Sequence, residues 1–348
     1  MGNILSQCYP PPPTLTATEL PDLSGKVFLI TGASSGVGFE LAKLLYQRHG
    51  TVYVAARSLE KAERAITDIK AAFPLSDGRI EFLHLDLDDL TIIKKSAHDF
   101  MGREQRLDVL WNNAGVMIPP SGSVTKQGYE LQLGTNCVAP FLFTKLLLPI
   151  LKKTAAESAP GSVRIAWASS ITIDLISPTG GMDLDDLAYA RGSQRYKYAQ
   201  SKVGNYFLGS EFARRLADDG IISVTFNPGN LSTALMRHAP TLLDLFMKPF
   251  LHLPIFGAYT ELYAGLSPDI PLHNYNQNHN HPHEHGLVGM YIMPWGRIQD
   301  PSRARPDILA SLMPATNALA AAEKGEERGT SKACRFWEWC ERETEGFC

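Results

Sequence analysis

The stretch KVFLITGASSGVG, residues 26–38, decides the fold class. It begins with the apolar and β-branched run VFLIT, which is typical of a buried strand. Gly32, Gly36 and Gly38 follow at the spacing G-x-x-x-G-x-G, and a helical pattern, FELAKLLYQRHG, comes next. A strand, a glycine-rich turn and a helix in this order are the first part of a βαβ unit.

Beyond this stretch, short apolar runs alternate with longer helical patterns as far as Pro228. Each run is rich in Val, Ile, Leu or aromatic residues and is bounded by Gly, Asp, Asn or Pro. We expect strands at 26–31, 51–56, 79–85, 107–112, 162–169 and 221–226, and a seventh at 286–294 after a long excursion. Such alternation predicts an α/β fold, a doubly wound, Rossmann-like parallel sheet with helices on both faces.

The turn after the first strand is a candidate dinucleotide site. Its glycines allow close backbone approach, and the following helix points its N-terminal amides toward a pyrophosphate. A glycine-rich turn without a ligand is the alternative. The candidate residues are Gly32, Ser34, Ser35, Gly36, Val37 and Gly38.

The end of the second strand indicates which dinucleotide would bind. The sequence AARS, residues 55–58, places Arg57 where NAD-binding sites usually carry an acid for the ribose 2′-hydroxyl. An arginine pairs with a 2′-phosphate, whereas a carboxylate repels it. We therefore expect NADPH rather than NADH. The alternative is a surface arginine at the start of a helix.

Two further strand ends complete the predicted cofactor site. Asp86 and Leu87 follow the third strand and are expected beside the adenine, although Asp86 or Asp88 would also serve to cap the next helix. The NNAG sequence, residues 112–115, closes the fourth strand. Its amides and small residues suit a turn held against a flat ring, and the candidates are Asn113, Ala114 and Gly115.

The stretch SQRYKYAQSK, residues 193–202, contains several Tyr–Lys combinations. Only Tyr198 has a lysine four residues later, Lys202, and positions i and i+4 share one face of a helix. Tyr196 has Gln200 at that spacing. The pair is either a proton-transfer site or part of a polar helix surface.

Together the motifs TGASSGVG, NNAG, SS, YAQSK and NPG resemble those of the short-chain dehydrogenases/reductases, in the family's order over about residues 24–235. The chain is similar to the retinol-dehydrogenase-like branch, and its tail MYIMPWGRI…FWEWCERE resembles fungal members, many of which act in secondary metabolism. The resemblance implies an NADP(H)-dependent oxidoreductase acting on CH–OH and C=O groups.

The resemblance also assigns a catalytic tetrad. It implies that Tyr198 donates or accepts the proton, that Lys202 lowers the tyrosine pKa and holds the ribose, and that Ser170, not Ser169, orients the substrate oxygen. Asn136 would hold a water of a proton relay. Both Tyr198 and Lys202 would also contact the cofactor, and further contacts to the nicotinamide are implied for Pro228, Gly229 and Thr233.

Elementary chemistry supports the Tyr–Lys assignment. A free phenol has a pKa of about 10, and a lysine charge about 4 Å away supplies roughly the 4 kcal/mol that moves this pKa toward 7. Pro140 lies four residues after Asn136 and has no backbone N–H, so we expect a helix kink that leaves the Asn136 carbonyl free. The 28 residues between Ser170 and Tyr198 include an insertion that would shape the pocket mouth.

The remaining segments suggest how the domain is arranged. We expect a flexible N-terminal arm at 1–22 and a single domain at 23–348, with a helical extension over about 300–348. The apolar run 239–262 lies within a substrate-lid region of about 235–285, which favours a lipophilic small molecule as substrate; packing as core helices is the alternative. The histidine-rich tract 273–285 reads as a solvated loop, and no metal site is expected.

Composition and the N-terminus bear on partners and location. A net charge of −3 gives no general attraction to nucleic acid, and five scattered cysteines suggest a reducing, cytoplasmic setting.

The start MGNILS permits myristoylation of Gly2, and Cys8 offers a second acylation site, so peripheral membrane contact is compatible with the sequence. Oligomerisation is left open. The rival interpretation is a non-catalytic nucleotide-binding scaffold or sensor recruited to a membrane in this way.

Overall fold

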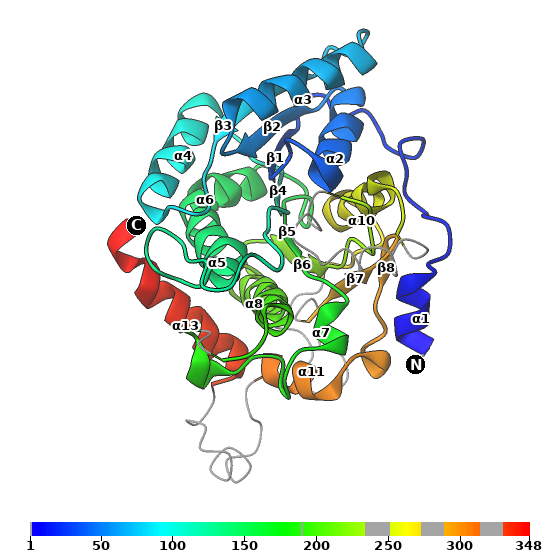
Figure 1. The fold of residues 1–348 in the computed structure, drawn as a ribbon. Coiled ribbons are helices and arrows are strands. Elements are labelled where there is room, and N and C mark those ends of the chain that lie inside the picture. Colours follow the sequence, from blue (N-terminus) through cyan, green and yellow to red (C-terminus); the bar gives the residue numbers. More distant parts are fainter. Residues whose placement is uncertain (1, 189–190, 234–250, 273–288, 314–329) are drawn as a thin grey trace.

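The computed structural model describes residues 2–188, 191–233, 251–272, 289–313 and 330–348. Its centre is a sheet with the strand order β3-β2-β1-β4-β5-β6-β7-β8 (Figure 1). Strands β1 to β7 run parallel, and β8 is antiparallel to β7. The strands are β1 Val27–Thr31, β2 Thr51–Ala56, β3 Arg79–His84, β4 Val109–Asn112, β5 Arg164–Ala168, β6 Ile222–Phe226, β7 Tyr291–Met293 and β8 Arg297–Ile298.

The first six predicted strands and the doubly wound fold class are confirmed. The seventh is shorter than the predicted range 286–294, whose first three residues lie outside the described part of the chain. The eighth strand was not expected. Pro294 has no N–H to continue a ladder, and Gly296, at φ +89°, turns the chain back with a hydrogen bond from its N–H to the Met293 carbonyl.

Two helical layers cover the sheet, one on each face. Alternate residues of β1 divide between two apolar cores: Leu29 belongs to one and Phe28 to the other. One layer contains α2 (Gly36–Gln47), α3 (Leu59–Ala72) and α10 (Pro254–Leu266). The other contains α4 (Leu90–Arg103), α6 (Ala139–Ala156) and α8 (Gln194–Arg215).

Helix α6 continues a longer helical run that starts with α5 (Leu131–Leu133) and a π-helical turn, η1 (Gly134–Val138). By length and hydropathy the whole run, Leu131–Ala156, would be long enough to cross a membrane. However, 72% of its most apolar window is buried inside the fold. Its apolar character is therefore explained by packing against the sheet.

The expected substrate lid is corrected in part. Residues 235–250 and 273–285, including the histidine-rich tract, lie outside the described residues. The segment between them forms α10, whose Ala258 and Leu262 are fully buried in the core and whose neighbours are α2 and the central strands. This helix is apolar because it covers the sheet, which is the alternative interpretation of that part of the run.

The N-terminal segment also differs from the expected flexible arm. Residues Gly2–Cys8 form helix α1, and the Gln7 side chain is only 1% exposed. Leu20 is buried as well, and the Arg48 guanidinium binds the Ala17 carbonyl. These contacts give the segment fixed partners, which its proline-rich sequence did not reveal.

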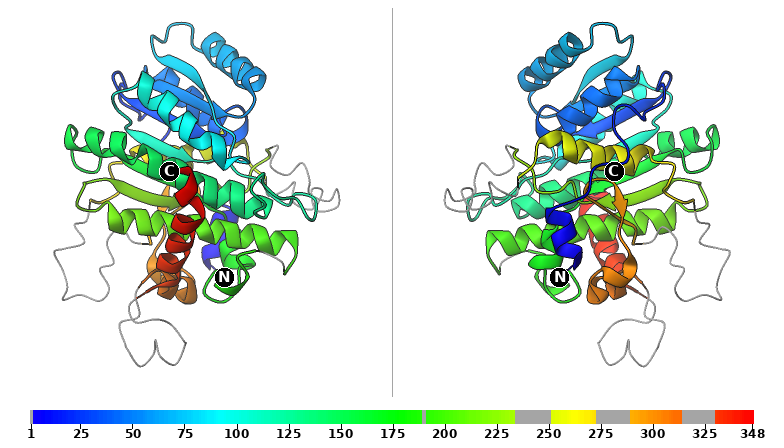
Figure 2. Two further views of the ribbon diagram at one scale, coloured as in Figure 1. Left: turned by 90° about the vertical axis from the view of Figure 1, so that its left-hand side faces the viewer. Right: turned by 90° about the vertical axis from the view of Figure 1, so that its right-hand side faces the viewer.

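The chain after residue 300 forms η5 (Pro301–Arg303), α11 (Pro306–Leu312), α13 (Lys332–Thr344) and η6 (Glu345–Phe347). Helix α13 lies along α8, where Trp337 inserts between Phe141 and Phe212 at ring-centroid distances of 4.8 and 4.5 Å. Figures 1 and 2 show that the first and last helices flank the part of the molecule that carries α8.

Candidate active site

A pocket of about 760 Å³ lies at the carboxyl ends of the parallel strands, where open α/β sheets bind their ligands. It extends from the turn after β1 to helix α8 and the loop after β6. The predicted residues that line it are Gly32, Ser34, Ser35, Gly36, Val37, Arg57, Asp86, Leu87, Asn113, Ala114, Gly115, Ser170, Tyr198, Lys202, Pro228, Gly229 and Thr233. Gly38 and Asn136 are the predicted site residues that do not line it.

The turn after β1 has the geometry of a phosphate cradle. Gly32 adopts φ +74°, and a Cβ atom there would come within 3.0 Å of the Ala114 Cα atom. Ser35 precedes α2 but makes no side-chain capping hydrogen bond, so the first amides of α2 are not satisfied by that hydroxyl. An anion bound at this helix end would find backbone donors and a free hydroxyl, so the residues fit a pyrophosphate.

Gly38 does not line the pocket but packs against Asn113, which does. A Cβ atom there would lie 2.7 Å from the Asn113 amide nitrogen. Asn113 uses that nitrogen to donate to the Thr31 carbonyl, and the Ala114 N–H donates to the Thr31 hydroxyl at 2.9 Å. Gly38 is therefore needed for the two turns to pack together, and its predicted contact with the cofactor stays a prediction.

The ends of β2 and β3 place Arg57 and Asp86 in the same pocket. The helix cap of α4 is Asp89, which accepts from the Thr91 N–H, so the alternative role of Asp86 or Asp88 as that cap is wrong. One Asp86 oxygen accepts from the Asp88 N–H. Burial and the charge of Asp86 raise the pKa of Asp88, while the nearby Arg57 charge acts in the opposite direction.

Tyr198 and Lys202 lie one turn apart on α8, and both side chains are almost completely buried. The Lys202 ammonium lies 5.7 Å from the centre of the Tyr198 ring. It donates to the Ala168 carbonyl at 3.0 Å, which fixes it at the end of β5. Tyr196, which was rejected by spacing, does not line the pocket.

The expected lowering of the tyrosine pKa by Lys202 stays a prediction. Burial raises the pKa of Tyr198 to about 12, and the hydrogen bond with Ser170 acts in the opposite direction. Burial also lowers the pKa of Lys202 to about 8. In both groups, burial disfavours the charged form. Tyr198 is consequently protonated at neutral pH, as a proton donor must be.

Two neighbouring serines after β5 have different surroundings. The buried Ser169 hydroxyl donates to the Lys202 carbonyl at 2.9 Å and so joins β5 to α8. The Ser170 hydroxyl is partly exposed, accepts from the Thr172 N–H at 3.3 Å and contributes the hydrogen bond to Tyr198. Ser170 is the serine that a substrate in the pocket can reach beside the phenol.

Asn136 lies behind the site, within the π-helical turn. Its side-chain oxygen accepts from the Val116 N–H at 2.8 Å, and its amide nitrogen donates to the Val116 carbonyl and the Ser201 hydroxyl. The side chain thus ties the segment after β4 to helix α8. The proposed role of its main-chain carbonyl in a relay stays a prediction, consistent with the irregular helix before Pro140.

Several residues around the substrate end were not predicted from the sequence. Tyr291, on β7, donates to the Ser170 carbonyl at 3.1 Å. Cys8 reaches the pocket from the N-terminal helix. The wall here is largely apolar, and its apolar or weakly polar residues are Cys8, Met117, Ile118, Leu175, Ile176, Leu231 and Leu251.

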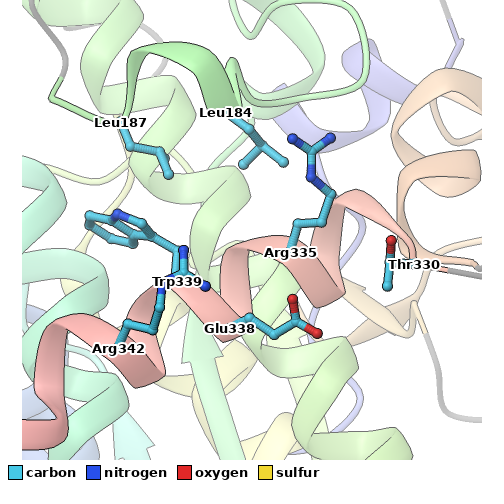
Figure 3. A pocket seen from close by; sticks show the side chains of 7 residues that line it. All are labelled: Leu184, Leu187, Thr330, Arg335, Glu338, Trp339 and Arg342. Atoms are coloured by element: carbon cyan, nitrogen blue, oxygen red, sulfur yellow. The ribbon is translucent and has the colours of Figure 1, made fainter. Parts of the chain in front are cut away.

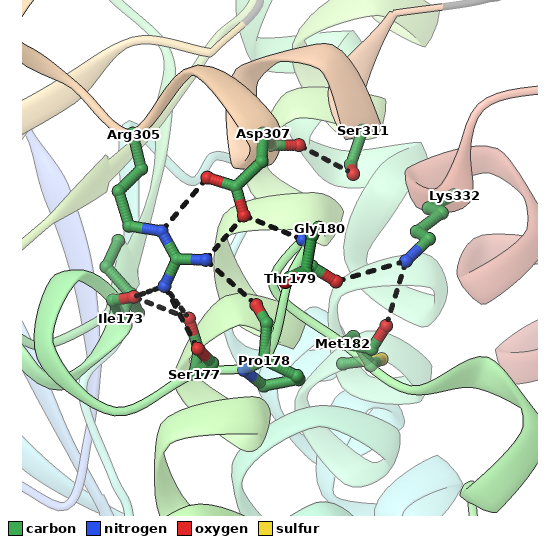
Figure 4. A network of polar contacts seen from close by, with 10 residues as sticks. All are labelled: Ile173, Ser177, Pro178, Thr179, Gly180, Met182, Arg305, Asp307, Ser311 and Lys332. Carbon is green, nitrogen blue, oxygen red and sulfur yellow. Dashed lines mark hydrogen bonds and ion pairs between the residues drawn. The ribbon is translucent and has the colours of Figure 1, made fainter.

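The insertion after Ser170 forms α7 (Thr172–Leu175) and the short helix η2 (Leu184–Asp186). A polar network from the C-terminal segments holds it in place (Figure 4). Arg305 donates to the carbonyls of Ile173, Ser177 and Pro178, and Asp307 accepts from the Gly180 N–H at 2.7 Å. The C-terminal segments therefore hold residues 173–180 of the insertion through several hydrogen bonds.

A second, smaller pocket of about 390 Å³ lies between η2 and α13 (Figure 3). Leu184, Leu187 and Trp339 supply its apolar part, and it contains none of the predicted site residues. Within the described ranges, no group of three or more His, Cys, Asp or Glu side chains is arranged to hold a metal ion.

Known proteins resemble this chain over most of its length. The family model for short chain dehydrogenases matches residues 26–171. A short-chain dehydrogenase/reductase from Phomopsis amygdali is 44% identical over the whole chain and 98% of its own length. The chain belongs to the short-chain dehydrogenase/reductase family. A second fungal member, pkfC from Emericella nidulans, is 50% identical over 74% of this chain and 84% of its own length.

Among solved structures, one similar structure is the RhlG/NADP active-site complex of Pseudomonas aeruginosa. It has a TM-score of 0.54 and 25% identity, and the match covers 68% of this chain and 88% of that one. An uncharacterized protein from Mycobacterium Paratuberculosis matches 95% of this chain and 97% of its own, with a TM-score of 0.63 and 28% identity. As a family member, the protein is an oxidoreductase of alcohol and carbonyl groups that uses a nicotinamide dinucleotide.

Proposed function

We propose that the protein is an NADPH-dependent reductase or dehydrogenase that interconverts a carbonyl and an alcohol on a lipophilic small molecule in a biosynthetic pathway. The observation that carries the proposal is one pocket in which Tyr198, Lys202 and Ser170 meet both the glycine turn and an apolar wall. A structural Tyr–Lys pair would need no such surroundings.

In the reductive direction, the bound cofactor supplies a hydride to the carbonyl carbon. Ser170 donates a hydrogen bond to the carbonyl oxygen and holds it beside the phenol. Tyr198, protonated at neutral pH, gives its proton to the oxygen as negative charge develops there. Lys202, with a pKa of about 8, is largely charged at pH 7 and stabilises the phenolate that is left.

The preference for NADPH rests on Arg57 at the end of β2. Its guanidinium lies in the pocket wall close enough to Asp88 to influence that carboxyl group. A 2′-phosphate would bring a charge that an arginine pairs with and that the acids Asp86 and Asp88 alone would repel. The structural neighbour solved with NADP supports the same choice.

The proposed substrate class follows from the substrate end of the pocket. Leu175, Ile176, Leu231 and Leu251 offer carbon surface and few hydrogen-bonding groups, which suits a lipophilic ketone or alcohol. Relatives that match the chain over nearly its whole length are fungal short-chain dehydrogenases/reductases, and a fungal member of this branch suits a role in secondary metabolism. We therefore favour a biosynthetic role over one in central metabolism.

A peripheral membrane location is the second part of the proposal. On α1, Leu5 and Tyr9 beside it are 61% and 60% exposed, so a Gly2 acyl chain would have apolar side chains next to it at a membrane surface. Cys8 lies in the pocket wall. We accordingly propose acylation at Gly2 of a cytoplasmic protein, with the Cys8 thiol a less suitable second anchor.

The proposed activity is tested with purified protein, NADPH or NADH, and a panel of ketones of increasing chain length, followed at the nicotinamide absorbance. We expect consumption of NADPH, faster than of NADH, with KM falling as the carbon chain lengthens. NADPH binding without turnover of any ketone or alcohol in the panel would favour the scaffold interpretation. Faster turnover with NADH would overturn the cofactor assignment.

A further inference from the structure

The N-terminal helix α1 lies against the substrate end of the pocket, far outside the matched family segment. We infer that Gln7 on this helix is a positioning residue that joins the Ser170 segment to the loop after β6. The inference rests on the proposed function, because the substrate and the nicotinamide would meet between the Ser170 segment and the loop after β6. Its structural consequences are nevertheless measurable without turnover.

Gln7 makes one hydrogen bond with each half of its amide. Its Nε2 atom donates to the Asp174 carboxylate at 3.2 Å, and its Oε1 atom accepts from the Asn227 Nδ2 atom at 2.8 Å. The side chain is only 1% exposed. An ionised carboxylate can only accept, so an ionised, half-buried Asp174 fixes the direction of both bonds, and one amide orientation satisfies the set.

The Asn227 end of this bridge fixes the loop that carries Pro228 and Gly229. Asn227 uses its Nδ2 atom for Gln7, which leaves its Oδ1 atom to accept from the Gly229 N–H at 3.0 Å. Its own N–H donates to the Ile292 carbonyl at 2.8 Å. Gly229 has φ +93° and packs against Trp295, where a Cβ atom would be 2.6 Å from the indole. The loop thus depends on the orientation of the Asn227 amide.

The Asp174 end fixes the segment that carries Ser170. Asp174 is on α7, and its N–H donates to the Ile171 carbonyl, one residue after the catalytic serine. Arg305 binds the Ile173 carbonyl from the C-terminal segment (Figure 4). Helix α7 is therefore held by hydrogen bonds from both ends of the chain, from Gln7 near the N-terminus and from Arg305 in the C-terminal segment.

Other contacts hold α1 in position independently of Gln7. The Arg297 guanidinium donates to the Ser6 carbonyl at 2.7 Å, and the His252 ring nitrogen contacts the Cys8 carbonyl at 3.2 Å. A change confined to the Gln7 side chain should consequently disturb the two active-site segments while α1 stays attached. This separates a positioning role from simple anchoring of the helix.

The test exchanges the amide and the carboxylate. In Gln7→Glu two carboxylates face each other. The double variant Gln7→Glu with Asp174→Asn restores one amide and one carboxylate: the hydrogen bond between positions 7 and 174 is reversed, and the bond donated by the Asn227 Nδ2 atom keeps its direction. We expect kcat/KM for the best ketone of the panel to fall about tenfold or more in Gln7→Glu, mostly in kcat, and to recover to within about threefold in the double variant. The matched control is Leu5→Ala, because Leu5 is an exposed residue of the same helix. Its kcat/KM should stay within twofold of the wild-type value.

Hydrogen–deuterium exchange gives the readout that does not depend on activity. Gln7→Glu should raise exchange in peptides covering 171–176 and 227–231, and the double variant should return both to wild-type levels. Unchanged exchange in either segment, or a loss of kcat/KM that the double variant does not reverse, would overturn the positioning role. If wild type turned over no ketone, the proposed function would fail, while the exchange result would still decide whether Gln7 joins the two segments.

Discussion

The two ends of the main pocket are built in different ways. The cofactor end is formed by short turns that directly follow β1 to β4, all between residues 31 and 115. The substrate end combines α1, the insertion after β5, the loop after β6 and β7. Its hydrogen bonds join residues as far apart as Gln7 and Asn227. The first end is thus a consequence of the repeating βαβ topology, and the second depends on segments specific to this chain.

The largest test of this contrast is Tyr198→Phe, which removes the proton donor that lies between the two ends. We expect turnover to fall by roughly 10²–10⁴-fold, while NADPH still binds, because the glycine turn is untouched. Titration of NADPH fluorescence and steady-state kinetics measure the two effects separately. Tyr196→Phe is the matched control on the same helix and should keep wild-type turnover. Wild-type-like turnover in Tyr198→Phe would reject the mechanism.

The serines after β5 provide the second test. Ser170→Ala should lower kcat by about 10²-fold, as expected when a donor to a developing oxyanion is lost. Ser169→Ala should mainly lower the free energy of unfolding, by about 1 kcal/mol, because its hydroxyl joins β5 to the Lys202 carbonyl. Kinetics together with urea denaturation would measure both. The reverse pattern, with Ser169 controlling turnover, would exchange the two assignments.

The sequence predicted the cofactor end well because its signals are local. A strand, its terminal glycines or acids and the next helix are contiguous, so Gly32, Arg57, Asp86 and Asn113 were placed at one edge of the sheet before the structure was known. Gly38 was the exception in that group. Spacing identified this glycine but not its role, which is to let the turn carrying Asn113 pack closely, because that contact joins segments far apart in the sequence.

At the substrate end, prediction was limited by contacts between distant segments. Tyr198 and Lys202 could be found because both are on one helix, but Gln7, Tyr291 and Arg305 reach the Ser170 segment only through the tertiary fold. The burial of Tyr198 and Lys202 was equally invisible in the sequence. It raises the pKa of the phenol and lowers that of the ammonium, and the sequence argument considered the lysine charge without it.

The third test compares a buried acid in each helical layer. Glu261 on α10 is fully buried, and neither carboxylate oxygen has a partner among the described residues. Glu211 on α8 is equally inaccessible but is paired with Arg214 and Arg215. Burial raises the pKa of Glu261 well above its usual value, so folding favours the protonated form of Glu261.

A raised folded-state pKa makes stability depend on pH in a defined direction. The stability associated with a protonated Glu261 is fully present below the unfolded-state pKa of about 4.3 and declines by about 1.4 kcal/mol per pH unit above it, toward the higher folded-state pKa. Glu261→Gln does not titrate there, so its unfolding free energy relative to wild type should increase between pH 5 and 7. Chemical denaturation at several pH values measures this, and Glu211→Gln should instead be destabilising throughout. A difference between Glu261→Gln and wild type that is independent of pH would contradict a neutral buried acid.

The smallest expected effect concerns the cofactor end alone. Arg57→Ala should weaken NADPH binding about tenfold and leave NADH binding nearly unchanged, because only the 2′-phosphate loses a charged partner. The control is Arg64→Ala, since Arg64 is an exposed arginine on α3 that pairs with Glu60 outside the pocket. Turnover at saturating NADPH should stay near wild type if the two ends act separately. A fall in kcat at saturating NADPH would show that losing the Arg57 contact with the 2′-phosphate also impairs catalysis at Tyr198. The two ends of the pocket would then not act independently.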